Sequence, residues 1–310
     1  MVLKRGLMMI FFGLLVCQVR PAFAILDFDV FVGSVGTFSG PRDPQLRRFS
    51  PDGIPDGGIP LAVQDTPFGL ATVGSDMFAF ICNRLYRFST DGAYLGTVAS
   101  DFASDPITLQ IDPLGNFYVA STDDSVTKLS PDGEVLVQIT NLNDPFGANG
   151  DASGNIYASV RNEMRIYDAT GQFLEAIPTG FTFNSAIAID HERDLLFHAA
   201  QNALLQTYDL SSGRPVFVDE LAIPSGGISL AMTYDPNTDH LFVGGTTSAY
   251  QITTDGMLVQ QYARNLFNWG VVAVPVPEPG YIAPHLFAVL TMIALVRRRQ
   301  RFDGVVSSGE

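Results

Sequence analysis

Six short segments of one shape recur along the chain, and this repeat restricts the possible folds more than any other feature. Each segment alternates apolar and polar residues for about four positions and then ends in a turn of the Ser-Pro-Asp-Gly type. The closing glycines stand 38 to 43 residues apart. The segments are Leu46–Gly53, Leu85–Gly92, Val126–Gly133, Met164–Gly171, Leu205–Gly213 and Ala249–Gly256. A period near 40 residues is typical of stacked or circular arrays of one structural unit.

A second element recurs upstream of these segments and completes the repeat unit. It is a strand, a tight turn led by aspartate, and an aromatic-rich strand, as in Ile111–Val119. The leading residues are Asp112, Asp151, Asp190 and Asp235. Aspartate leads such turns because its carboxylate accepts hydrogen bonds from the backbone just ahead of it. Together the two elements predict four antiparallel strands in about 40 residues, which is one blade of a β-propeller. We therefore expect an all-β, six-bladed propeller over residues 25–275.

The two ends of the repeat indicate how the ring closes. The first repeat lacks its opening strand and begins at Asp29–Ser34, which matches the aromatic strand of the other repeats. The last segment, Gly270–Val274, matches an opening strand, and no further repeat follows it. Pairing these two segments would complete one blade and remove two open sheet edges. The repeats resemble those of NHL-type and related six-bladed propellers, a resemblance that implies the fold and no particular activity.

The N-terminus has the pattern of a secretory signal peptide over residues 1–24. Lys4 and Arg5 precede an apolar stretch from Gly6 to Cys17, and Ala22 and Ala24 form an A-x-A cleavage site. We expect cleavage after Ala24 and export through the inner membrane.

The C-terminus resembles a PEP-CTERM sorting domain over residues 276–301. The motif Val276, Pro277, Glu278 and Pro279 comes first, the uncharged stretch Tyr281–Val296 follows, and Arg297, Arg298, Arg299 and Arg301 close it. Arginines resist transfer across the bilayer, which predicts a transmembrane helix with residues 302–310 as a short cytoplasmic tail. The resemblance implies processing by an exosortase-type enzyme and a membrane-anchored, cell-surface or extracellular location. A plain C-terminal anchor is the alternative.

The start of each opening strand is where six-bladed propellers often bind ligands. Those starts fall near Phe68, Asp105, Phe146, Asn184, Ser225 and Asn268. Asp105, Asn184 and Asn268 could hold a divalent cation such as Ca²⁺ through oxygen ligands. This set resembles that of calcium-dependent lactonases on the same fold, although no matching glutamate can be assigned.

No motif in the sequence predicts a catalytic residue. There is no G-x-S-x-G nucleophile elbow, no glycine-rich phosphate loop and no H-E-x-x-H zinc motif. His191 and His240 fall in the aspartate-led turns, and His198 follows an aromatic strand. The net charge of −14 disfavours binding to nucleic acid, because a surface this acidic repels phosphate backbones.

Two main functional hypotheses follow. The first is a non-enzymatic surface or matrix protein whose propeller binds an envelope or extracellular polysaccharide or protein. The alternative is a metal-dependent, lactonase-like hydrolase or lyase acting in the central channel. A third possibility is an envelope assembly factor that binds its partner through the rim of the ring.

Overall fold

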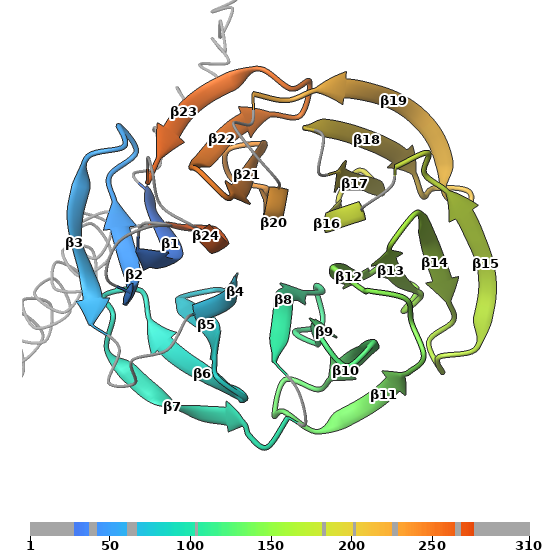
Figure 1. The fold of residues 1–310 in the computed structure, drawn as a ribbon, viewed down its shortest axis with the longest axis horizontal. Helices are drawn as coiled ribbons and strands as arrows, with labels where there is room; N and C mark the ends of the chain where they lie inside the picture. The colour runs from blue at the N-terminus through green and yellow to red at the C-terminus, as the bar shows by residue number, and fades with distance from the viewer. Residues whose placement is uncertain are drawn as a thin grey trace, which may run out of the picture.

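The protein is a six-bladed β-propeller (Figure 1). The computed structural model describes residues 28–36, 42–60, 67–102, 105–181, 184–200, 203–224, 229–263 and 268–275. Within these residues the strands form six antiparallel sheets of four strands each, arranged around one axis. The all-β, six-bladed architecture expected from the repeat is therefore confirmed.

Strands at equivalent positions in the six blades form concentric layers. The innermost strands are β24 (Asn268–Pro275), β4 (Pro67–Val73), β8 (Pro106–Ile111), β12 (Gly147–Gly150), β16 (Asn184–Asp190) and β20 (Ser229–Asp235). The second layer is β1 (Phe28–Gly36), β5 (Asp76–Ile81), β9 (Phe117–Ser121), β13 (Ile156–Val160), β17 (Leu195–Ala200) and β21 (His240–Gly245). The third is β2 (Arg42–Phe49), β6 (Arg84–Ser89), β10 (Ser125–Leu129), β14 (Glu163–Tyr167), β18 (Leu204–Asp209) and β22 (Ala249–Thr253). The outermost strands are β3 (Pro55–Pro60), β7 (Tyr94–Ala99), β11 (Val135–Ile139), β15 (Phe173–Pro178), β19 (Val216–Ala222) and β23 (Leu258–Tyr262).

Blade 1 is assembled from both ends of the described chain, as the sequence predicts. Strand β24 pairs with β1 in a register that runs from Phe28 opposite Pro275 to Gly33 opposite Gly270 (Figure 1). Blades 2 to 6 follow along the chain and begin with β4, β8, β12, β16 and β20. The pairing closes the ring with main-chain hydrogen bonds and leaves neither strand as an open edge.

The hydrophobic core is divided into six clusters, each lying between two neighbouring blades. Between blades 2 and 3, for example, Phe80 and Leu85 pack with Leu109 and Val119. Edge-to-face aromatic pairs join neighbouring blades as well, such as Phe28 with Phe242 at a ring-centroid distance of 5.9 Å. Every blade is therefore stabilised by two neighbours, which makes closure of the ring important for all of them.

The closing glycine of the repeat has two roles, one within its blade and one between blades. In blade 3, Gly133 donates its N–H to the Ser130 carbonyl at 2.9 Å with a φ of +84°. A Cβ at Gly133 would lie 2.3 Å from the carbonyl oxygen of Val98 in blade 2. The turn of one blade thus rests on the outer strand of the preceding blade, which a larger residue would prevent.

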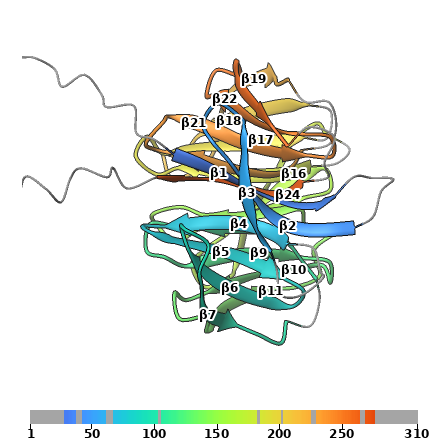
Figure 2. The same cartoon turned by 90° about the vertical axis from the view of Figure 1, so that its left-hand side faces the viewer.

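The two predicted targeting segments lie outside the described residues. These are the signal peptide, with Ala22 and Ala24, and the sorting segment, residues 276–301. The described part of the chain contains no helix with the length and apolarity needed to span a membrane. Viewed edge-on, the ring has β3 of blade 1 nearest the viewer (Figure 2).

Candidate functional site

A cavity of about 830 Å³ opens at one end of the central channel. It is lined by the C-terminal ends of the six innermost strands and the turns that follow five of them. We call this cavity the cup, and the face on which it opens the cup face. Its described lining residues are Ala71, Thr72, Val73, Gly74, Gln110, Ile111, Asp112, Pro113, Asn149, Ala152, Ile189, Asp190, His191, Glu192, Thr233, Tyr234, Asp235, Pro236, Asn237, Val272 and Ala273.

The floor of the cup contains a hydrogen bond that crosses the channel. Gln110 on β8 donates from Nε2 to the main-chain carbonyl of Met232 on β20 at 2.7 Å. Strands β8 and β20 belong to blades 3 and 6, which lie opposite each other in the ring (Figure 1). Beside it, Thr233 Oγ1 donates to the Val271 carbonyl of blade 1 at 3.0 Å. The floor is thus held by contacts between residues that are distant in sequence, and Gln110 narrows the channel beneath the cup.

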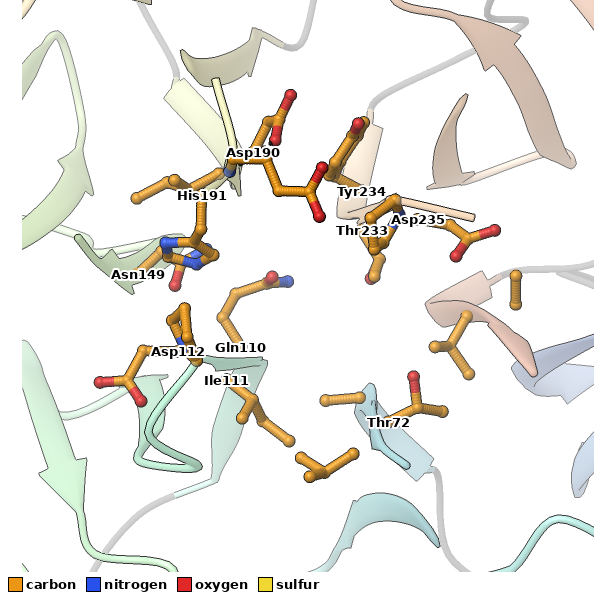
Figure 3. A pocket seen from close by; sticks show the side chains of 18 of the residues that line it. Thr72, Gln110, Ile111, Asp112, Asn149, Asp190, His191, Thr233, Tyr234 and Asp235 are labelled. Atoms are coloured by element: carbon orange, nitrogen blue, oxygen red, sulfur yellow. Dashed lines mark hydrogen bonds between the residues drawn. The ribbon is translucent and has the colours of Figure 1, made fainter. Parts of the chain in front are cut away.

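Asn149 on β12 contributes a polar group to the floor that has no partner. Only 2% of its surface is exposed. Its Oδ1 accepts the Gly150 N–H at 2.9 Å, so that atom is the carbonyl oxygen and the amide nitrogen Nδ2 occupies the other position. No described residue hydrogen-bonds to Nδ2. Figure 3 shows Asn149 beside His191 and Gln110 on one side of the cup.

The carboxylates of Asp112 and Asp151 are engaged in holding their own turns. Asp112 Oδ1 accepts the N–H groups of Leu114 and Asn116, both at 2.9 Å. Its Oδ2 accepts Asn116 Nδ2 at 2.8 Å and the Tyr118 hydroxyl at 3.0 Å. Asp151 makes the same four kinds of bond with residues 153, 155 and 157. The turn role predicted for these aspartates is confirmed, and the Asp112 carboxylate points away from the centre of the cup (Figure 3).

In blades 5 and 6 an arginine takes part in holding the turn. Asp190 accepts the N–H of Glu192 at 3.0 Å and pairs with the guanidinium of Arg193. Arg193 also pairs with Asp239 and donates to the Tyr234 hydroxyl at 3.1 Å, which joins blade 5 to blade 6. Burial raises the pKa of Asp190, but the hydrogen bonds from Arg193 and the backbone outweigh it, so the pKa lies below its ordinary value.

Asp235 in blade 6 is bonded by its own turn. It accepts the Asn237 N–H at 3.2 Å and the Thr238 hydroxyl at 2.8 Å. Its carboxylate points away from the centre of the cup, as that of Asp112 does (Figure 3). The turn role predicted for the leading aspartate therefore holds in all four of these blades.

The three described histidines lie in different environments. His191 lines the cup, and burial lowers its pKa although nearby carboxylates, Asp112 first among them, oppose that shift. His240 begins β21 and bonds through Nδ1 to Gln251 at 2.8 Å. His198 lies within β17 rather than after a strand. It is fully buried at the junction of blades 4 and 5, where its Nε2 is 3.1 Å from Ser159 Oγ.

Burial also sets the protonation state of His198. It lowers the pKa of this histidine to about 4, against a weaker opposing influence of Gln206. Its Nδ1 is a buried atom without a hydrogen-bond partner in the described structure. At neutral pH the imidazole is therefore uncharged.

The residues proposed from sequence for a metal site lie at the other end of the channel. Asp105 precedes β8 and is exposed, while Asn184 and Asn268 are the first residues of β16 and β24. The side chains of Asn184 and Asn268 lie outside what the structure describes, so this site stays a prediction. Asp105 lines a second cavity of about 340 Å³ together with Phe68 and Phe146. Among the described residues there is no cluster of three His, Cys, Asp or Glu side chains placed to hold a metal.

Sequence reasoning missed the three polar residues of the floor. Gln110 and Asn149 each stand two residues before the leading aspartate of their blade, as does Thr233 before Asp235. This shared position is a signal that an alignment of the repeats with one another would have shown. It identifies the layer of side chains that faces the channel beneath the turns.

Comparisons with known proteins identify the fold and no family. No family model matches the chain, and no curated protein matches it in sequence. A protein of unknown function from Bacteroides caccae superposes with a TM-score of 0.62 at 16% identity, covering 81% of this chain and 100% of that one. A chain of a nidogen/laminin complex gives a TM-score of 0.61 at 15% identity, covering 80% of this chain and 98% of that one. At such identities the likeness concerns the propeller fold alone.

Proposed function

We propose that this protein is exported, sorted to the bacterial surface and used there as a non-enzymatic binding or matrix protein. Its NHL-like propeller would bind an envelope or extracellular polysaccharide or protein through the cup. The cup supports this proposal most directly. Its volume of about 830 Å³ falls within the range of about 300–1,000 Å³ that small-ligand sites occupy.

The way the cup is built favours binding over catalysis. The carboxylates of Asp112 and Asp235 accept hydrogen bonds from their own turns, and Asp190 pairs with Arg193. These groups hold the shape of the cup, because their oxygens already accept hydrogen bonds from the fold. A rigid, preformed cavity loses little entropy when it accepts a ligand.

The direction in which the chain leaves the propeller bears on how the cup would be used. Strand β24 ends at Pro275 on the cup face, directly before the predicted sorting motif at Val276–Pro279. A tether starting there would hold the cup face towards the membrane. The five residues 276–280, which would link Pro275 to the predicted membrane segment, span at most about 17 Å when extended. A large partner would then reach the cup only after an exosortase-type enzyme has processed the motif.

The second candidate is a metal-dependent, lactonase-like enzyme that uses the other end of the channel. The observation that favours it is the placement of Asp105, Asn184 and Asn268 at the start of innermost strands in blades 3, 5 and 1. These are alternate blades, so the three residues surround one end of the channel. Carboxylate and amide oxygens in such a ring are suitable ligands for Ca²⁺.

One set of experiments separates the two candidates. The full chain is expressed in a Gram-negative host that carries an exosortase, with Pro277→Ala and Glu278→Ala variants as controls for sorting. We expect surface-exposed or released protein that binds purified envelope material, and variants that stay in the membrane fraction. Cytoplasmic protein would refute the proposal. One tightly bound calcium per chain together with lactone hydrolysis would establish the enzyme instead.

A further inference from the structure

We propose that the ligand of the cup is an uncharged, hydroxyl-rich molecule, a saccharide unit, which accepts a hydrogen bond from Asn149 Nδ2. This inference rests on the proposed binding function and specifies its ligand. The carrying observation is a side chain that is 98% buried and still has an unused donor facing the cavity. Asn149 Nδ2 opens onto the cup rather than being sealed within the protein, so a ligand atom in the cup can accept its hydrogen bond.

The free donor restricts the ligand group that can sit on the floor. Gln110 Nε2 and the Thr233 hydroxyl already donate to main-chain carbonyls, whereas Asn149 Nδ2 donates to no described residue. A ligand that covers Asn149 must therefore offer an acceptor, because leaving the amide dehydrated and unpaired would cost affinity. Hydroxyl and carbonyl oxygens meet this need, and an ammonium or guanidinium group, which only donates, does not.

The charge around the cup excludes acidic ligands. Asp112, Asp190, Glu192 and Asp235 are among its lining residues, and the described lining contains neither lysine nor arginine. Bringing a carboxylate or phosphate into this field would be opposed by like-charge repulsion in a partly desolvated site. An uncharged ligand avoids this repulsion. It also offers Asn149 Nδ2 the acceptor that a cationic group lacks.

The remaining surface of the cup suits a sugar, which presents both apolar C–H groups and polar hydroxyl groups. Ile111, Ile189 and Val272 supply apolar wall, against which the C–H groups of a pyranose ring can pack. His191 lines the cup on the same side as Asn149 in the view of Figure 3, and burial lowers its pKa, so its imidazole is uncharged at neutral pH. A neutral imidazole carries one donor and one acceptor nitrogen, which matches the two-sided hydrogen bonding of a hydroxyl group.

The test is isothermal titration of the purified full chain with probes of similar size and different charge. The neutral probes are maltotriose, cellotriose and triacetylchitotriose, the acidic probe is trigalacturonate, and the cationic probe is spermidine. We expect at least one neutral trisaccharide to bind with a Kd below about 1 mM, and the charged probes to bind at least about tenfold more weakly.

Variants locate the binding at the cup. Asn149→Leu nearly keeps the size of the side chain but offers a ligand hydroxyl neither a donor nor an acceptor, so we expect binding to weaken by at least about tenfold. Thr72→Phe fills the cup from blade 2 without touching Asn149 and should also abolish binding. Asn162→Ala, in the exposed β13–β14 turn on the opposite face, is the matched control and should bind as the unaltered chain does. Circular dichroism confirms that each variant is folded.

Three outcomes would overturn the inference. They are no binding of any neutral trisaccharide up to about 10 mM, equal or tighter binding of trigalacturonate or spermidine, and neutral-sugar binding that both Asn149→Leu and Thr72→Phe leave unchanged. If the chain still binds envelope material in any of these cases, the surface-binding function stands and its ligand is a protein or lies elsewhere on the ring. Loss of all envelope binding would remove both proposals.

Discussion

Blades 3 and 4 follow the repeat closely, whereas blades 5 and 6 depart from it. The two pairs of blades use different contacts to hold the aspartate-led turn. In blades 3 and 4 the leading aspartate is held by an asparagine and a tyrosine of its own blade, as with Asn116 and Tyr118. In blade 5 the aspartate pairs with Arg193, which also reaches Asp239 in blade 6. The leading turns of blades 3 and 4 are thus held within their own blade, whereas that of blade 5 is also tied to blade 6.

The two pairs of blades also differ in how their hairpin turns pack on the preceding blade. A Cβ at Gly133 in blade 3 would meet the Val98 carbonyl at 2.3 Å, and one at Gly171 in blade 4 would meet Val137 at 2.7 Å. At Gly213 in blade 5, whose turn is one residue longer, a Cβ would find nothing within 4 Å. The turns of blades 3 and 4 therefore pack closely on the preceding blade, and the longer turn of blade 5 does not.

Replacing the closing glycine by alanine should test this difference with the largest effect. Both Gly133 and Gly213 have positive φ, which costs an alanine roughly 1–2 kcal/mol at either site. Gly133→Ala adds a clash with main chain, so we expect its free energy of unfolding to fall by more than about 3 kcal/mol and that of Gly213→Ala by about 1 kcal/mol. Urea denaturation measures both. Equal losses would mean that the contact between the turn and the preceding blade contributes nothing to stability.

Acid should weaken the junction between the two pairs of blades, where His198 of blade 5 contacts Ser159 of blade 4. Burial lowers the pKa of His198 to about 4, below the value of about 6.5 expected in the unfolded chain. Because the unfolded state takes up the proton first, stability is lost as pH falls from 6.5 towards 4, by on the order of 3 kcal/mol in total. His198→Gln should lose less stability over this range. Ser159→Ala, which keeps the histidine, should retain the steep dependence, and parallel curves for all three proteins would contradict this account.

The salt dependence of the free energy of unfolding should distinguish the ion-paired turn from the turn held by neutral side chains. This is the smallest of the three expected effects. Arg193 is about two-fifths exposed, so Arg193→Gln should reduce the free energy of unfolding by about 1 kcal/mol at low salt. High salt should diminish that loss, because it screens exposed ion pairs. Asn116→Ala removes a buried hydrogen bond to a carboxylate and should cost roughly 1.5–3 kcal/mol at any salt concentration. A salt-independent loss in Arg193→Gln would show that packing on Tyr234 matters more than charge.

The blade count, the turn roles of the aspartates and the closure of the ring all follow from the sequence. These features are encoded locally, because strand alternation and turn chemistry act within four to eight residues. Even the pairing of β24 with β1 could be predicted, since the first repeat lacks the strand that the last segment supplies. The signal peptide and the sorting segment remain predictions from sequence, as both lie outside the described residues.

The set of side chains that forms the cup follows only from the tertiary structure. Gln110 bonds to Met232 across 122 residues of sequence, and only the closed ring brings blades 3 and 6 opposite each other. The same is true of Arg193, whose partner Asp239 belongs to the next blade. A repeat pattern states what each blade is made of. Which side chains meet at the axis depends on the number of blades and the radius of the ring, and therefore on the packing of all six blades together.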